Sequence, residues 1–106
     1  MDESVTKYLE QPKVGTLKLS EAIRIGARMS GPAFGVFSDA AGKTCAQGAA
    51  LLAIGKLSSN TLENHRTMER IWKEVPGNLR YAIAGMNNSR THTREQIADW
   101  LEAQGH

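Results

Sequence analysis

The stretch Thr91-His-Thr-Arg-Glu-Gln-Ile-Ala-Asp-Trp-Leu-Glu-Ala-Gln104 carries the clearest helix signal in the chain, and our interpretation of the fold starts from it. Thr93 is a favoured N-cap residue, and Gln96 stands three positions later, where its side chain can bond back to the N–H of the cap. This pair is a capping box, so a helix is predicted to begin directly after Thr93.

One face of this terminal helix is apolar. Ile97, Trp100 and Leu101 follow the i, i+3, i+4 spacing that places side chains on one side of a helix. We therefore expect Trp100 to be a central core residue on which the upstream helices pack. The charged residues of the helix are expected off that face, and they are Arg94, Glu95, Asp99 and Glu102.

A second helix is predicted from the cap residue Ser20 to the break at Ser30-Gly31-Pro32. Gly26 weakens this helix, and we expect it to let another backbone approach closely rather than to mark a ligand site. The buried stripe is expected to comprise Leu19, Ala22, Ile23 and Ala27.

The segment Cys45–Ile54 is small and apolar on nearly every side, which is typical of a helix buried all round. Thr44 and Gln47 form a second predicted capping box, and Gly55 closes the helix. We expect this segment to be the central helix of the domain.

Residues 31–43 are rich in glycine and turn residues, and they contain Phe34 and Phe37, the only two phenylalanines of the chain. We predict an ordered glycine-rich loop anchored by these two rings. A small β-hairpin over residues 34–44 is the alternative, and it would make the fold α+β.

Further helices are predicted over residues 61–75, before the break at Pro76-Gly77, and from about Asn78 to residue 88, with a short one over residues 4–11. The inward faces comprise Leu62, His65, Met68, Trp72 and Val75 in the first, and Leu79, Ala82, Ile83 and Met86 in the second. The predicted fold class is therefore all-α, a compact single domain over residues 1–106 with five or six short helices around the Cys45–Ile54 helix.

The composition is that of an ordinary globular chain. Of the 106 residues, 41% are hydrophobic and 23% are charged, which suits one hydrophobic core. The formal net charge of +2 is too small to indicate nucleic-acid binding by itself. A single cysteine excludes an internal disulfide, and no apolar run reaches the roughly 20 residues that span a membrane. We expect a cytoplasmic protein with no membrane partner.

Three blocks of the sequence carry a family resemblance: Lys18-Leu-Ser-Glu-Ala-Ile-Arg-Ile-Gly-Ala27, Thr44-Cys-Ala-Gln-Gly-Ala-Ala50 and Thr93-Arg-Glu-Gln-Ile-Ala-Asp-Trp-Leu-Glu102. In this order they resemble a group of short uncharacterised bacterial and phage-associated proteins, and the last block is the most specific. No activity is established for that group, so the resemblance implies a common fold and no particular chemistry.

Cys45 is the most enzyme-like residue, because the start of a helix lowers the pKa of a thiol and favours the nucleophilic thiolate. His65 or His92 could supply the base that such a nucleophile needs. Neither histidine stands in a recognisable catalytic motif, so we interpret Cys45 as a small buried hydrophobe.

Two ligand sites are also considered and set aside. Gly42-Lys43-Thr44 resembles the end of a phosphate-binding loop, but Phe37 occupies the position of the first glycine of that motif. The cysteine and the three histidines lack the spacing of metal ligands. We therefore assign no catalytic, cofactor-binding or metal residue, and we expect neither a cofactor nor an enzyme.

Arg66, Arg70 and Lys73 share one side of the helix predicted over residues 61–75, where they could contact phosphate groups. Glu63 and Glu69 are interleaved with them at helical spacing, which is more typical of a solvated face of ion pairs. Nucleic acid is therefore not an expected partner, and weak nucleic-acid binding is kept as the alternative function.

Non-catalytic protein–protein interaction or assembly is the function that these patterns favour, with a homodimer as the expected form. Between Gly31 and Gly55 only Asp39 and Lys43 are charged, so this surface should be unusually apolar. A two-fold partner commonly covers such a patch. The candidate interface residues are Phe34 and Phe37. An unknown protein partner and, third, a cysteine-dependent enzyme are the remaining hypotheses.

Overall fold

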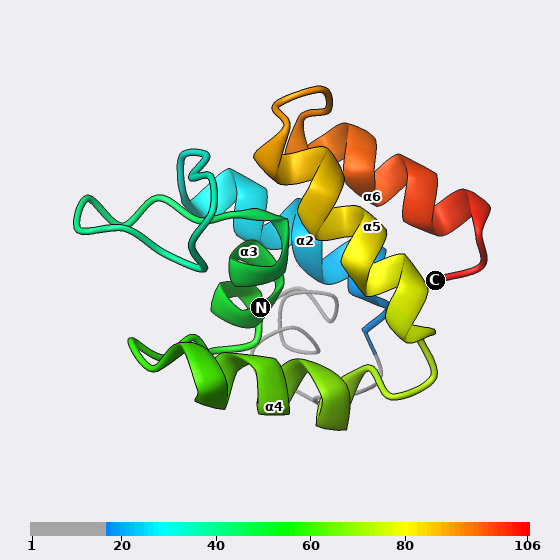
Figure 1. The fold of residues 1–106 in the computed structure, drawn as a ribbon, viewed down its shortest axis with the longest axis horizontal. Helices are drawn as coiled ribbons and strands as arrows, with labels where there is room; N and C mark the ends of the chain where they lie inside the picture. Colours follow the sequence, from blue (N-terminus) through cyan, green and yellow to red (C-terminus); the bar gives the residue numbers. More distant parts are fainter. Residues whose placement is uncertain (1–16) are drawn as a thin grey trace, which may run out of the picture.

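The computed structural model describes residues 17–106, so the helix predicted over residues 4–11 lies outside the described part. Five helices follow one another: α2 (Leu19–Met29), α3 (Ala46–Ala53), α4 (Thr61–Ile71), α5 (Gly77–Asn88) and α6 (Arg94–Ala103). Figure 1 shows α2 and α3 at the centre, with α4 on one side and α5 and α6 on the other.

The predicted all-α class is confirmed. Between residues 17 and 106 there is no strand, and the stretch expected as a loop or a hairpin holds only two isolated bridges, in which Pro32 and Ser38 each pair with Thr44. The loop alternative is therefore the one that the structure adopts. None of the helices in this range is long and apolar enough to cross a membrane.

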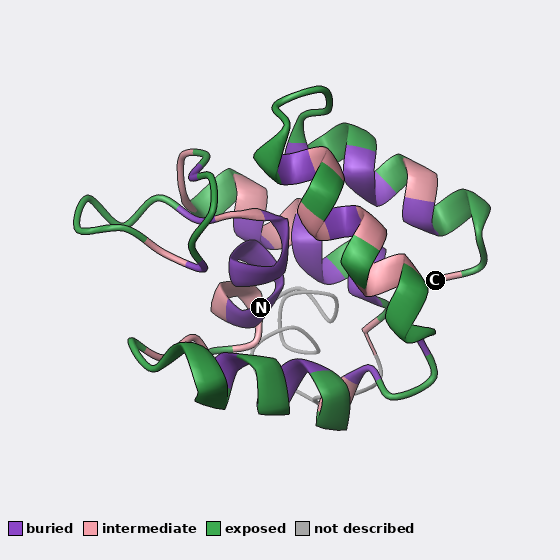
Figure 2. Cartoon of the chain, in the orientation of Figure 1, coloured by how far each residue is buried: buried purple, intermediate pink, exposed green. Residues whose placement is uncertain are grey.

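The centre of the fold is α3, as its sequence predicts. Its first six residues, 46–51, are all buried, whereas Ala53 near its end is only half-buried (Figure 2). α2 packs directly on it at Gly26, where an added Cβ would lie 1.8 Å from the carbonyl oxygen of Ala49. On another side, a Cβ on Gly48 would lie 1.9 Å from the carbonyl oxygen of Phe37. Gly26 and Gly48 therefore allow the backbones of α2, α3 and the loop at Phe37 to lie in direct contact.

Trp72, rather than Trp100, is the large aromatic residue of the core. Trp72 has no exposed surface, and its indole Nε1 donates a hydrogen bond of 3.0 Å to the carbonyl oxygen of Leu17. Trp100 lies half-buried at the edge of the core, while Ile97 and Leu101 of the same helix are fully buried. The expectation that Trp100 is central is therefore wrong.

Arg94 explains the orientation of α6, and the prediction that it lies on the outer face is also wrong. It is 7% exposed, and its guanidinium donates hydrogen bonds to the carbonyl oxygens of Ser30 at 2.6 Å and Ala27 at 3.2 Å. It also reaches the hydroxyls of Ser30 and Thr44, each at 3.1 Å. The buried residues of α6 are consequently Arg94, Ile97, Ala98 and Leu101.

The Arg94 network closes the end of α2. The last carbonyls of a helix have no partner inside the helix, and a cation there also opposes the negative end of the helix dipole. Because the same guanidinium bonds the residue that precedes the cap of α3, it joins three helices. Burial lowers the pKa of Arg94, and no carboxylate forms an ion pair with it among the described residues.

Two helix starts differ slightly from those predicted. α2 begins two residues earlier, with Lys18 as its N-cap, so Ser20 is buried within the first turn. α3 is capped by Cys45 instead of Thr44, and the cysteine Sγ accepts a hydrogen bond of 3.3 Å from the N–H of Gly48. α6 begins as predicted, and both bonds of its capping box are present.

α4 is shorter than predicted and is rotated about its axis. It ends at Ile71, and a turn carries the buried Trp72 and Val75. Leu62 and His65 lie at the surface, which contradicts their expected inward position. Met68 is buried as predicted, but its buried neighbours on α4 are Asn64 and Thr67, and the Asn64 amide bonds both the N–H and the carbonyl of Ser58.

We expect Gly26→Ala to destabilise the fold by about 3 kcal/mol, because its methyl group would overlap backbone that cannot move aside. Gly85→Ala is the matched control, since nothing lies within 4 Å of a Cβ at that helical position. The control should stabilise the fold by about 0.5–1 kcal/mol through helix propensity. Urea unfolding of both variants measures the difference, and two variants of equal stability would contradict the close α2–α3 contact.

We expect Arg94→Lys to lower the free energy of unfolding by at least about 2 kcal/mol, because an ammonium group cannot reach all the buried carbonyls and hydroxyls that the guanidinium satisfies. Arg24→Lys is the comparison. Arg24 also joins α2 to α6, through Asp99 at 2.7 Å and Glu102 at 2.8 Å, but both carboxylates are largely exposed. Arg24→Lys should lower the free energy of unfolding by less than about 1 kcal/mol. Equal melting temperatures for the two variants would argue against a structural role for Arg94.

Candidate functional site

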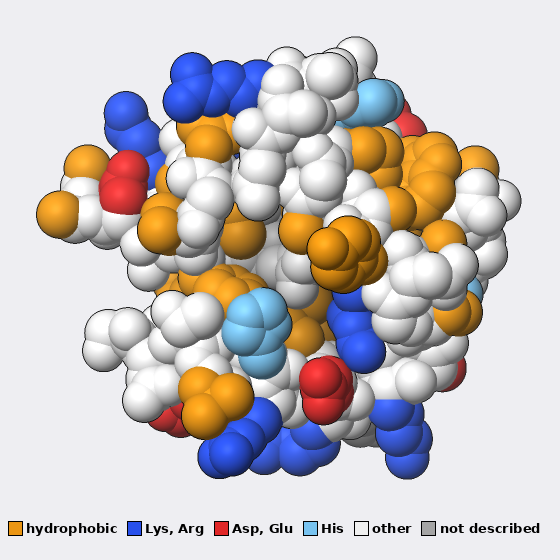
Figure 3. Space-filling model, in the orientation of Figure 1, with side chains coloured by type: hydrophobic (Ala, Val, Ile, Leu, Met, Phe, Trp, Pro, Cys, Tyr) orange, Lys and Arg blue, Asp and Glu red, His pale blue; other side chains and the backbone are white. Residues whose placement is uncertain are grey.

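A pocket of about 270 Å³ opens between the glycine-rich loop, the start of α3, and the facing sides of α4 and α5. Figure 3 shows one face of the molecule, with hydrophobic side chains gathered around a central hollow. The residues that line the pocket include no Asp, Glu, Lys or Arg. Its walls therefore combine apolar side chains with neutral hydrogen-bonding groups and one histidine.

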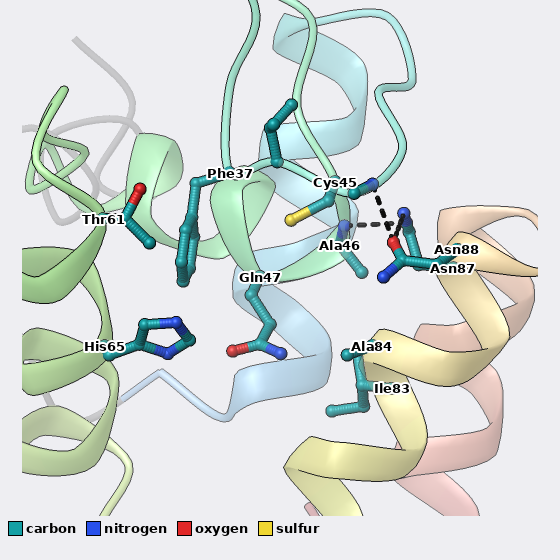
Figure 4. Close-up of a pocket in the computed structure, with 12 residues that line it drawn as sticks. Phe37, Cys45, Ala46, Gln47, Thr61, His65, Ile83, Ala84, Asn87 and Asn88 are labelled. Carbon is teal, nitrogen blue, oxygen red and sulfur yellow. Dashed lines mark hydrogen bonds between the residues drawn. The ribbon is translucent and has the colours of Figure 1, made fainter.

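Two asparagines at the end of α5 hold one wall in place (Figure 4). The side-chain oxygen of Asn88 accepts a hydrogen bond of 2.8 Å from the N–H of Gly35 in the loop. The buried Asn87 accepts one of 3.0 Å from the N–H of Ala46 and donates one of 2.9 Å to the carbonyl of Ala33. α5 therefore fixes both the loop and the first turn of α3. The sequence marked these asparagines only as a helix end.

The two candidate interface residues occupy different environments. Phe37 is 9% exposed, and its ring packs edge-on against the imidazole of His65, with 4.9 Å between the ring centroids. Phe34 is 38% exposed, and the guanidinium of Arg90 lies 4.4 Å from its ring centroid. Phe37 anchors the loop to the core, as predicted for the loop, so only Phe34 of the pair is presented at the surface.

Cys45 lies at the pocket wall, where the structure gives it the character of a protonated thiol. Burial raises the pKa of this thiol, although the hydrogen bond from the N–H of Gly48 acts in the opposite direction. The ring of Phe37 packs against His65 (Figure 4), and no hydrogen bond joins Cys45 to a histidine in residues 17–106. The geometry thus offers no activated nucleophile.

Gln47 is one of two buried polar residues that line the pocket, the other being Asn87. It is buried, and its Nε2 donates a hydrogen bond of 3.3 Å to the carbonyl oxygen of Arg80 on α5. Figure 4 shows the other end of the amide, the Oε1 atom, directed across the pocket toward His65. The pocket therefore presents a hydrogen-bond acceptor at the bottom of apolar walls.

The segment Gly42-Lys43-Thr44 does not form a phosphate cradle. Thr44 is buried against Arg94, while Lys43 is exposed. The first N–H groups of α3 are already bonded to Asn87 and Cys45. Within residues 17–106, no group of three or more His, Cys, Asp or Glu side chains is placed to hold a metal ion.

Arg66 and Arg70 are exposed on α4, as expected, and Lys73 is exposed in the turn that follows this helix. Their predicted pairing with Glu63 and Glu69 does not occur, because the ion pairs found in the described part of the chain both belong to Arg24. The carboxylates nevertheless stand between the cations, so the face has no strong positive field.

Comparison of the chain with models of protein families, with curated proteins and with solved structures finds no match. The function is therefore argued from the geometry of this chain.

Native Cys45 should react slowly with iodoacetamide at pH 8, at least about tenfold slower than the urea-unfolded chain, because only the thiolate is nucleophilic. Because burial raises the pKa of this thiol above its ordinary value, the labelling rate should rise at a higher pH in the native protein than in the unfolded chain. Folding stability should correspondingly fall as the pH rises through this range, because the unfolded thiol loses its proton first. Mass spectrometry of the labelled protein over time provides the measurement, and equal rates in both states would contradict the burial of Cys45.

Proposed function

We propose that this chain is a non-catalytic protein–protein interaction module that self-associates through the face that bears the pocket. The observation that carries the proposal is the position of three exposed hydrophobic residues. Val36 lines the pocket, Leu62 follows a pocket residue on α4, and Tyr81 lies one helical turn before Ala84, a pocket residue on α5. We call Val36, Leu62 and Tyr81 the pocket rim.

The pocket and its rim together have the composition of an interface core. Such cores are depleted of charged residues and enriched in aromatic and aliphatic side chains. Covering a large aliphatic side chain contributes roughly 1.5–3 kcal/mol, so three rim residues and the pocket walls supply a substantial driving force for association. Phe34 adds a fourth exposed hydrophobic residue on the neighbouring part of the loop.

The competing functions lack comparable support. A cysteine-dependent enzyme needs a thiolate and a base in contact with it, whereas burial raises the pKa of Cys45 and no hydrogen bond joins its sulfur to a histidine in residues 17–106. Nucleic-acid binding needs a basic surface, whereas Glu63 and Glu69 interrupt the cations of α4.

Leu62→Gln should weaken self-association by about tenfold, the equivalent of 1.4 kcal/mol, because it places a polar amide on the pocket rim. Met29→Gln is the matched control, because Met29 is 58% exposed and Leu62 is 57% exposed, but Met29 lies at the end of α2 and does not line the pocket. The measurement is sedimentation equilibrium over a concentration series of the wild type and both variants.

The expected result is a mass that rises toward two chains in the wild type and in Met29→Gln, with Leu62→Gln shifted to higher concentration. A wild-type mass of one chain into the high micromolar range would overturn self-association. Repeating the series with a short DNA duplex, at low and at high salt, tests the alternative, because contacts to nucleic-acid phosphates weaken steeply with salt and apolar contacts do not.

A further inference from the structure

Tyr81 is the most exposed of the large hydrophobic side chains in residues 17–106, with 85% of its surface in solvent. Its helix, α5, forms a wall of the pocket through Ile83, Ala84 and the two asparagines. Within the described part of the chain, the Tyr81 side chain makes no hydrogen bond and no aromatic or cation–π contact. The tyrosine therefore projects from the edge of a pocket without contributing to the fold.

The volume of the pocket indicates which kind of ligand fits it. Sites for drug-sized ligands have volumes of roughly 300–1,000 Å³. At about 270 Å³ this pocket is slightly smaller, which suits a single large side chain. Its open mouth lies on the protein surface between α4 and α5, so a side chain can enter from a second molecule (Figure 3).

The chemistry of the pocket matches a phenol. Phe37, Ile83 and Ala84 offer apolar contacts to a ring, and the Phe37 ring presents a surface suited to an aromatic partner. The Gln47 Oε1 atom offers an acceptor beyond them (Figure 4). A buried tyrosine hydroxyl needs such a partner, and an aliphatic side chain would leave the acceptor unused.

We propose that the pocket binds Tyr81 of a second copy of this chain, with the ring against the apolar walls and the hydroxyl donating to the Gln47 Oε1 atom. The inference rests on the self-association proposed above and names the residue that accomplishes it. Because Tyr81 lies one helical turn from Ala84 in the pocket wall, a two-fold axis that passes between Tyr81 and the pocket mouth places each tyrosine at the pocket of the other copy. Both rims are then covered in one symmetric contact.

Two single variants test the inserted Tyr81 side chain, which we call the key, separately from the pocket that receives it. Tyr81→Ala removes the ring from an exposed site, so the fold is preserved and only the key is lost. Ala84→Phe fills the pocket from its own wall and leaves Tyr81 in place. Each variant alone should raise the dissociation constant of the homodimer by about tenfold or more, the expected effect of removing a buried aromatic anchor.

Mixing the two variants is the decisive measurement. A heterodimer of Tyr81→Ala with Ala84→Phe contains one intact key facing one intact pocket, whereas each homodimer contains none. Energy transfer between separately labelled chains should therefore show heterodimers forming at several-fold lower concentration than either homodimer. Tyr81→Phe, which keeps the ring, should weaken the wild-type homodimer by about threefold, the equivalent of one neutral hydrogen bond.

The outcomes distinguish the two proposals. If the wild type associates but Tyr81→Ala associates equally well, Tyr81 is not the occupant, although self-association stands. If the variants weaken the homodimer but their mixture does not recover, the reciprocal insertion is overturned. If the wild type stays monomeric into the high micromolar range, both proposals fail, and the pocket then takes neither a second copy nor its tyrosine.

Discussion

The guanidinium of Arg94 is the interaction on which the arrangement of the helices depends. It satisfies carbonyl oxygens at the end of α2 and the hydroxyl of Thr44, just before α3, while its own backbone begins α6. A buried cation without a carboxylate is costly unless every donor finds an acceptor. Here the acceptors include two main-chain carbonyls at the end of α2, where the helix dipole favours a positive charge. One side chain thereby sets where three helices meet.

The pocket follows from the way in which the loop is held. Gly48 allows the loop backbone to lie against α3, and Phe37 then fills the space beside His65. Asn88 draws Gly35 toward α5, and the left-handed φ of +79° at Gly35 suits a residue without a Cβ. The loop is consequently fixed at two points, on opposite sides of an opening that no side chain of residues 17–106 fills. A rigid, uncharged opening of this kind costs little to occupy, because it does not have to be ordered first.

Local patterns in the sequence predicted the features that local chemistry decides. The capping box at Thr93, the all-round apolar character of α3 and the role of Gly26 each depend on residue type and spacing along one helix, and each is found. The spacing of residues could not predict that the face of α6 that bears Arg94 is the buried one. Arg94 looked like a surface charge, and only the distant carbonyls of α2 make its burial favourable.

The same limit applies to the pocket. Phe34 and Phe37 are indistinguishable by composition, and the choice of Phe37 for the interior depends on Gly48 and His65, which are brought to it by the fold. Asn87 and Asn88 resemble an ordinary helix end, because their bonds reach residues more than 40 positions away. Tyr81 carries no periodic signal at all, since an exposed aromatic residue is notable only beside a pocket.

The separation of these partners along the chain has a consequence for biosynthesis. Helical domains usually fold quickly because most of their contacts are local. Here the N–H of Ala46 and the carbonyl of Ala27 find their side-chain partners 41 and 67 residues later. While a ribosome is still translating the middle of the chain, α2 and α3 can collapse together but their ends lack these bonds. We therefore expect this domain to reach its final packing in one late step, after residue 94 has left the ribosomal exit tunnel.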